Sequence, residues 1–430
     1  PLVLASCATG GDAGSDPGTL RIATVDNRDL LRLEELSARF TADNPEITLE
    51  WVTLDENILR QRVMMDIATG QEQFDVVTVG TYEVPIWAER DWLLELDGFS
   101  DTEDLLPSIR EALSVDGTLL AAPFYGESSF TMYRTDLFAE AGLEMPDQPT
   151  WEFLSEAAAT ISQSSEGVYG ICLRGKPGWG ENIGLITAMA NSYGARWFDE
   201  DFQPQLDSEA WSSTVTDYYS MLNDYGPPEA ATLGYTENLA LFQEGQCGIW
   251  VDATVAASAL TDPEESSVAG DVGFAAAPGT GLDKQSNWLW SWALAVPADS
   301  ANAEAAKAFV TWATSPEYVE LVAAEDGWAN VPPGTRTSLY ENQEYLDAAP
   351  FAQLTLASIE AADPQDPTVD PVPYVGIQYV SIPSFPAIGD AVGNRIAEGL
   401  DGSISAEQAL EDSQWVTEKV ITQAEFADKE

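Results

Sequence analysis

The stretch FDVVTVG at residues 74–80 is an almost unbroken run of apolar and β-branched residues, which is typical of a strand covered on both faces. Upstream of it, residues 19–25 (TLRIATV) and 47–54 also have strand patterns. Between these strands, residues 29–43 and 55–69 carry apolar side chains at helical spacing. This alternation of strand and helix predicts an α/β fold with a parallel, doubly wound sheet.

Polar and aromatic residues follow these strands at the edge where a parallel sheet holds its ligands, beyond the carboxyl ends. Asp26 and Asn27 come directly after the first strand, and Tyr82 follows the third. We expect these three residues to bind a ligand. The alternative for each is a role in a turn or in capping the next helix.

The chain is too long for a single core. With 430 residues, two lobes are expected. Strand patterns return at residues 169–173 and 245–251, with helical segments between them, and they indicate a second lobe. Residues 363–373 are rich in proline and aspartate, which predicts a linker.

The charge is strongly negative and limits the partners. Asp and Glu number 72 against 18 Lys and Arg, a formal net charge of −54. A field of this sign repels nucleic acid and anionic membranes and argues against an anionic ligand. The simpler interpretation, an acidic and well-solvated surface, explains the same charge. No apolar run approaches the roughly 18 residues that span a bilayer.

The absence of histidine closes several classes of enzyme. No Ser-His-Asp or Cys-His arrangement and no His-ligated zinc site can exist. A glycosidase that uses two carboxylates stays open. No Gly-rich phosphate loop is present, and residues 363–367 lack the spacing of a calcium loop, so we expect no metal and no cofactor.

The amino terminus has the pattern of a lipidation signal. Residues 4–7 (LASC) resemble the bacterial lipobox, in which the cysteine receives the lipid, and residues 8–18 are a Gly-, Asp- and Ser-rich tether. We expect lipidation at Cys7 and an extracytoplasmic protein held to the outer face of a bacterial membrane only through that anchor. A free or buried thiol is the alternative. Cys172 and Cys247 lie in strand-like stretches, and the sequence leaves open whether they are buried thiols or a disulfide.

Several segments follow one another along nearly the whole chain. They are LASC (4–7), FDVV (74–77), LLAAPFYG (119–126), MYRTDLF (132–138), AGL (141–143) with PTW (149–151), FQEGQ (242–246), WALAVP (292–297), AFVTWATSPE (308–317) and residues 327–336. In the order of these segments, the chain resembles the extracellular solute-binding proteins of ATP-binding-cassette importers for carbohydrates. The resemblance implies a two-lobed, periplasmic-binding-protein-like fold of type II. Each lobe would be a doubly wound, mostly parallel sheet with helices, and the ligand cleft would lie between the lobes.

The resemblance also implies bounds for the parts of the chain. Residues 1–18 would be the signal remnant and tether, 19–128 with 293–370 the first lobe, and 129–292 with 371–430 the second.

Two segments, CLRGKPGWGEN (172–182) and NWLWSW (287–292), look like the mannitol- and sorbitol-binding branch of that family. The resemblance implies a monomer, without enzyme activity, that binds a neutral sugar alcohol reversibly. It would deliver this ligand to permease subunits served by a separate ATPase. A mono- or oligosaccharide ligand stays open as an alternative. A carboxylate-pair glycosidase and a surface scaffold without a cleft are more distant ones.

A neutral polyol needs paired donors and acceptors for its hydroxyls, and charged groups make the stronger bonds. Arg174 follows a strand, Glu127 lies where the resemblance places a crossing between lobes, and Asp252 follows residues 249–251. We expect all three to bind the ligand. A surface ion pair is the alternative for Arg174, and a helix cap is the alternative for Asp252.

Aromatic side chains can cover the C–H groups of such a ligand. Five aromatic residues in loops or near the crossings are candidates, and for each of them a place in the core is the alternative. They are Trp179, Trp290, Trp328, Tyr125 and Tyr379.

Overall fold

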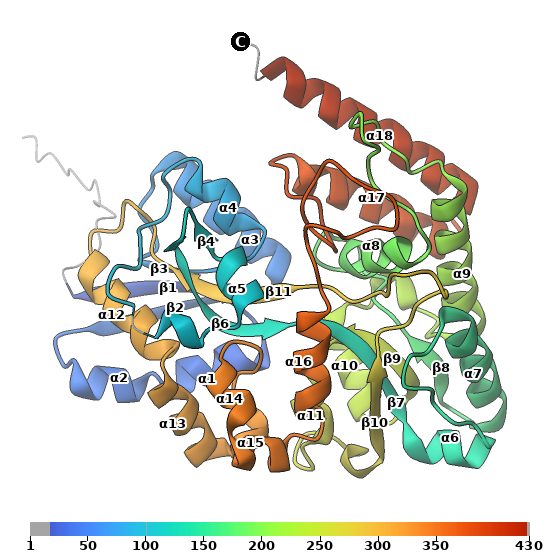
Figure 1. Cartoon of the computed structure of the whole chain (residues 1–430), viewed down its shortest axis with the longest axis horizontal. Helices are drawn as coiled ribbons and strands as arrows, with labels where there is room; N and C mark the ends of the chain where they lie inside the picture. The colour runs from blue at the N-terminus through green and yellow to red at the C-terminus, as the bar shows by residue number, and fades with distance from the viewer. Residues whose placement is uncertain (1–17, 100, 428–430) are drawn as a thin grey trace, which may run out of the picture.

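The computed structural model describes residues 18–99 and 101–427, which contain two larger sheets, each flanked by helices (Figure 1). The first sheet has the order β2-β1-β3-β11-β6, and the second has the order β10-β7-β9-β8. Cys7 lies outside the described residues. Among the described residues, no helix has the length and apolar character needed to cross a membrane.

The first sheet contains the strands predicted from the quoted stretch. Its members are β1 (Thr19–Val25), β2 (Thr48–Leu54), β3 (Val76–Gly80), β6 (Ala121–Glu127) and β11 (Trp290–Ala295). β1 pairs in parallel with β2 and β3, so Ile22 lies opposite both Trp51 and Val76. Every residue of β3 is buried, as the run of β-branched side chains predicts.

The second sheet is mostly antiparallel, which corrects the prediction of a mostly parallel sheet in each lobe. It contains β7 (Ser129–Arg134), β8 (Tyr169–Cys172), β9 (Cys247–Ala253) and β10 (Val272–Ala276). Only β8 and β9 run in parallel, while β7 is antiparallel to both β9 and β10. The first sheet is mixed as well, because β11 is antiparallel to β3 and β6.

The crossings between the sheets explain these strand directions. β6 ends at Glu127 in the first sheet and β7 begins at Ser129 in the second, so Ser128 alone separates them. β11 brings the chain back and pairs antiparallel with β6, with Trp290 opposite Glu127. β6 leaves the first lobe and β11 enters it beside β6, so the two strands run in opposite directions. The chain returns to the first sheet at Trp290, the first residue of β11, whereas the predicted first lobe resumed at residue 293. The other predicted lobe bounds stay a prediction.

Helices cover both sheets, as Figure 1 shows in blue on the side of the first sheet and in green on that of the second. The helices up to the first crossing are α1 (Arg28–Leu36), α2 (Ala38–Asp43), α3 (Glu56–Thr69), α4 (Glu83–Ala88), η1 (Thr102–Asp104) and α5 (Pro107–Ala112), with the hairpin β4 (Ser114–Val115) and β5 (Thr118–Leu119). Those between the crossings are α6 (Thr135–Ala141), α7 (Trp151–Ser164), α8 (Asn182–Ser192), α9 (Glu209–Tyr225), η2 (Ala230–Thr232), α10 (Tyr235–Gln243), α11 (Ala256–Thr261) and η3 (Ala269–Asp271). The later ones are α12 (Ala303–Ala313), α13 (Pro316–Asp326), η4 (Trp328–Asn330), α14 (Thr337–Glu341), α15 (Gln343–Ala348), α16 (Ala352–Glu360), α17 (Phe385–Leu400) and α18 (Ala406–Ala427). The last two return to the second lobe, where α17 contacts α8 and α9.

Local signals set several helix ends in the first part of the chain. Asn27 caps α1 by accepting a hydrogen bond from the Leu30 backbone N–H at 3.0 Å. Gly70 ends α3 in the left-handed conformation, with a φ of 59°. The single helix predicted over 29–43 is divided at Ser37 into α1 and α2.

Cys172 and Cys247 form a disulfide that joins β8 to β9. Both cysteines lie in the second sheet, and Cys172 is two residues before Arg174 in the chain. The two cysteines are therefore a disulfide and not free buried thiols.

Candidate functional site

A cavity of about 330 Å³ is lined by residues of both lobes. The first lobe supplies residues from the ends of β1 and β6 and from the start of α3, and the second supplies the loop between β8 and α8 together with the start of α10. Seven of the predicted ligand-binding residues line it. They are Asp26, Asn27, Tyr125, Glu127, Arg174, Trp179 and Trp290.

The other four predicted residues do not line this cavity. Asp252 is fully buried behind Arg174. Tyr82 and Tyr379 pack behind the wall, and the ring of Tyr82 lies 4.8 Å from that of Trp179. Trp328 lies in η4 and does not line this cavity, so its expected contact with a ligand stays a prediction.

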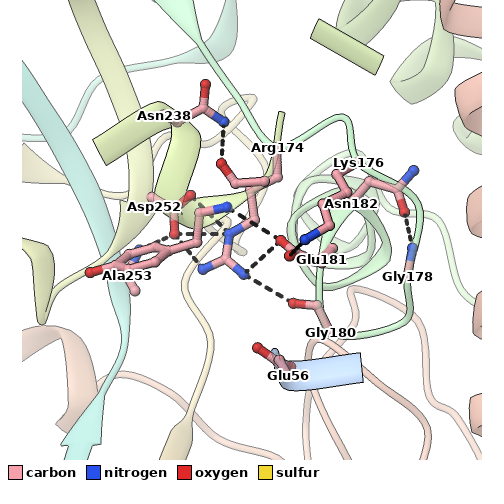
Figure 2. Close-up of polar contacts among 12 residues, drawn as sticks. Glu56, Arg174, Lys176, Gly178, Gly180, Glu181, Asn182, Asn238, Asp252 and Ala253 are labelled. Atoms are coloured by element: carbon pink, nitrogen blue, oxygen red, sulfur yellow. Dashed lines mark hydrogen bonds and ion pairs between the residues drawn. The ribbon is translucent and has the colours of Figure 1, made fainter. Parts of the chain in front are cut away.

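Arg174 is fixed by a bidentate ion pair with Asp252 (Figure 2). The Arg174 Nε lies 2.9 Å from Asp252 Oδ2, and Nη2 lies 2.6 Å from Oδ1. Asp252 also accepts hydrogen bonds from Trp250 Nε1 at 3.1 Å and from the Ala253 backbone N–H at 2.7 Å. Asp252 therefore orients Arg174 and does not cap the following helix.

The remaining contacts of Arg174 hold its guanidinium at the cavity wall. Nη1 donates to the Gly180 carbonyl at 3.0 Å and lies 3.7 Å from Glu181. Its guanidinium carbon lies 5.2 Å from the ring centre of Tyr235. Burial lowers the pKa of Arg174, but the charge and hydrogen bonds of Asp252, together with the charges of Glu181 and Glu56, more than offset this, and the net pKa is well above its usual range. Arg174 is a permanent cation in the wall.

Glu127 is a buried carboxyl with no fixed partner. Its side chain is 7% exposed, and no other described residue makes a hydrogen bond with it. Burial raises the pKa of Glu127 to about 8, against the opposing charge of Arg174, and the carboxylates of Asp252 and Glu56 add to the rise. Glu127 lines the cavity, so its carboxyl has bonding capacity that a group in the cavity could use.

Asn27 and Tyr125 form a fixed pair at the end of β1. The Asn27 amide nitrogen donates to the Tyr125 hydroxyl at 3.0 Å, while its oxygen caps α1. The cap role and the place in the cavity wall are thus compatible. Tyr125 keeps a hydroxyl proton available at all ordinary pH values, because burial raises its pKa well above 10.

Arg60 and Glu56, on the first turns of α3, line the cavity but were missed from the sequence. Arg60 Nε and Nη2 donate to Glu56 Oε1 at 3.1 and 2.9 Å, and Nη1 is paired with Glu83. The guanidinium lies against the indoles of Trp179, Trp290 and Trp292. A usable signal existed: α3 begins directly after β2, so its first turn lies at the same carboxyl edge as Asp26.

Lys176, Glu181, Tyr235 and Trp288 were missed from the second lobe. Lys176 Nζ joins the lobes, because it lies 3.2 Å from Glu181 and 3.3 Å from Asp55 at the start of α3. Lys176 and Glu181 belong to the quoted segment 172–182, in which only Arg174 and Trp179 were singled out. Tyr235 had no local signal, since its place depends on the packing of α10 against β9.

The arrangement is suited to hydrogen bonding of hydroxyl groups. Arg174 and Lys176 line the cavity with donors, and Asp26 and Glu127 line it with carboxyl groups. Within residues 18–99 and 101–427, no group of three or more cysteine or carboxylate side chains is arranged to hold a metal ion.

Comparison with known proteins shows the family of this chain. The model of the family described as "bacterial extracellular solute-binding protein" matches residues 29–320. A mannitol-binding protein of Pseudomonas aeruginosa is 53% identical over 411 residues, which cover 95% of this chain and 94% of the relative.

Solved structures agree with the fold. A solute-binding protein of an ABC transporter from Agrobacterium vitis S4, with bound D-mannitol, has a TM-score of 0.93 and 56% identity, over 94% of this chain and 99% of that one. A second, from Agrobacterium radiobacter K84 in complex with ribitol, has a TM-score of 0.83 over 95% of this chain and all of the other. At 24% identity, it shows the shared fold alone. The chain belongs to the bacterial extracellular solute-binding proteins, with the two-lobed type II fold, and it is a transport receptor and not an enzyme.

Proposed function

We propose that this protein binds a linear sugar alcohol of the mannitol, sorbitol or arabitol type in the cavity between its lobes. It then hands the unaltered ligand to the permease subunits of an ABC importer, whose ATPase is a separate protein. Cys7 carries the lipid that holds the protein at the outer face of the membrane, and the protein acts as a monomer.

The proposal rests on two observations together: the high sequence identity to proteins that bind mannitol, and the polar groups that line the cavity. Identity above 50% extends over nearly the whole chain to a relative named for mannitol and to a structure with bound D-mannitol. Arg174 and Glu127 both line the cavity, and a guanidinium donor together with a carboxyl group suits the hydroxyls of a polyol, which can accept from the one and donate to the other. The cavity volume of about 330 Å³ fits one small ligand better than an oligosaccharide.

Calorimetric titration with D-mannitol, D-sorbitol, D-arabitol, D-glucose and maltose tests the proposal. We expect at least one sugar alcohol to bind with a Kd in the micromolar range or tighter, and glucose and maltose to bind at least a hundredfold more weakly. A protein that binds maltose or glucose in preference contradicts the sugar alcohol as ligand. Boiled protein and buffer injections serve as controls for heats of dilution.

The lipid anchor has its own test. Expression of the full precursor in a bacterium fed a labelled fatty acid should label the wild-type protein and leave Cys7→Ser unlabelled. Equal labelling of both proteins would show that Cys7 is not the site.

A further inference from the structure

Arg60 lies inside the cavity wall in contact with three tryptophans. Its guanidinium carbon lies 4.1 Å from the ring centre of Trp179, 4.9 Å from that of Trp290 and 4.7 Å from that of Trp292. These distances are typical of a cation placed over an aromatic face. The three indoles are themselves between 5% and 6% exposed, so little of their surface is free.

Carboxylates on two helices hold Arg60 in this place. Glu56, one turn earlier on α3, accepts from Nε and Nη2, and Glu83 at the start of α4 accepts from Nη1. Glu83 is fixed in turn, because it accepts a hydrogen bond from the Gly80 backbone N–H at 3.0 Å. The guanidinium is therefore anchored and does not depend on a ligand for its position.

The covered indole faces limit the kind of ligand. A pyranose ring binds aromatic side chains by laying its C–H face on an exposed ring, as the apolar body of an indole allows. Here Arg60 occupies that position on Trp179, Trp290 and Trp292. An open-chain polyol has no such flat face, and it can be held by hydrogen bonds from Arg174 and the carboxyls alone.

Arg60 and Trp179 both lie between two cavities. Each of them lines the main cavity of about 330 Å³ and a second one of about 130 Å³. Tyr82, Trp87 and Asp390 also line the second cavity. Loss of the Arg60 side chain would remove one of these two shared side chains and enlarge the space that is open to a ligand.

We propose that Arg60 is a specificity-determining residue: it covers the aromatic surface and limits the space that is open to a ligand, and thereby selects open-chain polyols over pyranose sugars. This inference rests on the proposed function of the same site. It assigns a role that the hydrogen-bonding residues of the wall do not supply, since Arg174 and Glu127 can serve the hydroxyls of either ligand.

The test compares D-mannitol with D-glucose and maltose in wild type, Arg60→Ala and Arg62→Ala, by calorimetric titration. In wild type we expect mannitol to bind at least a hundredfold more tightly than either sugar. In Arg60→Ala this preference should fall at least tenfold, because the sugars gain ring surface and volume. Arg62 lies on the same helix, is exposed and lines neither cavity, so Arg62→Ala should keep the wild-type preference.

Removal of Arg60 leaves Glu83 buried without its cation, so a double variant, Arg60→Ala with Glu83→Gln, is measured if the single variant does not fold. A preference for mannitol that stays within threefold of wild type in a folded variant overturns the role of Arg60, whatever happens to the affinity itself. A wild-type protein that binds none of the sugar alcohols contradicts the proposed function instead. The two failures are thus separate.

Discussion

Arg174 and Glu127 are both buried at the cavity, yet their surroundings differ in kind. Arg174 has a bidentate partner in Asp252, which also accepts two further hydrogen bonds, from Trp250 Nε1 and from the Ala253 backbone N–H. Glu127 has no such partner within the described residues. A paired charge fixes geometry before the ligand arrives, whereas an unpaired carboxyl leaves bonding capacity for the ligand. The paired state of Arg174 predicts that its removal lowers the stability of the protein. The unpaired state of Glu127 predicts that the stability depends on pH.

Arg174→Ala should lower the free energy of unfolding by roughly 3–5 kcal/mol, because it leaves Asp252 buried without its counter-charge. Urea unfolding without ligand measures this. Lys284→Ala is the matched control, since Lys284 pairs with Asp366, whose side chain is 72% exposed, and such pairs contribute about 1 kcal/mol or less. Equal costs for the two variants would show that Asp252 is satisfied without Arg174.

In the wild-type protein, Glu127 should make the free energy of unfolding fall as pH rises, and Glu127→Gln should remove this dependence. The pKa of Glu127 is raised to about 8 in the folded protein, so its contribution is present below the ordinary glutamate pKa and is lost as pH rises toward 8. The free energy of unfolding of wild type minus that of the variant should fall by roughly 3–5 kcal/mol between pH 5 and 9.

Urea unfolding of both proteins at several pH values measures that difference, in which other titrating groups cancel. Asp97→Asn is the control, because Asp97 is exposed and pairs with Lys307, which lowers its pKa. A difference that does not change with pH would show that Glu127 is charged in the folded protein at pH 5.

At the scale of elements, the sequence predicted well what depends on local pattern. The strands at 19–25 and 74–80 and the end of α3 at Gly70 follow from alternation, β-branching and a glycine cap. Strand direction in the second sheet could not be predicted in this way, because it depends on where the chain crosses between lobes. The same limit applies to the site: residues after strands were found, whereas Arg60 is set by contacts with indoles from distant segments.

The loop between β8 and α8 meets the start of α3 across the cavity, and glycine allows this approach. A Cβ on Gly180 would lie 2.1 Å from Glu56 Oε1, and Glu56 is not free to turn away because it holds Arg60. Gly180→Ala should therefore hinder closure of the lobes and weaken ligand binding about tenfold or more, with the unliganded thermal stability little changed.

Titration calorimetry and thermal unfolding measure the two quantities. Gly270→Ala is the matched control, because a Cβ on Gly270 meets nothing within 4 Å and its backbone is not in the left-handed region. Unchanged affinity in Gly180→Ala would show that Glu56 and Arg60 rearrange at little cost.

At the scale of the molecule, contacts at several places join the lobes around the cavity, and two of them are ion pairs. Lys176 pairs with Asp55 on one side, and Arg28 of α1 reaches the end of α11 on the other. A ligand can shift such a protein toward closure only by binding the closed form more tightly. Contacts between the lobes that form without ligand shift the equilibrium between the open and closed forms before the ligand binds. They therefore change the affinity although they do not touch the ligand.

Arg28 provides the clearest test of this balance. Its guanidinium donates to Ser258 Oγ at 3.0 Å and to Glu265 at 2.8 Å and lies 3.3 Å from Asp262, all in the second lobe. Arg28→Ala should increase the radius of gyration of the unliganded protein in small-angle X-ray scattering and weaken ligand binding about three- to tenfold. The liganded radius should match wild type, because the ligand still favours closure.

Arg39→Ala separates this effect from the loss of any surface arginine. Arg39 pairs with Glu325 between α2 and α13, both on the side of the first sheet, and its side chain is 64% exposed. That variant should keep both the unliganded radius and the affinity. If Arg28→Ala also leaves the two quantities unchanged, the partially exposed ion pairs of Arg28 are offset by solvation, and other contacts between the lobes, such as those of Lys176 and of Arg60 with Trp179, hold this arrangement.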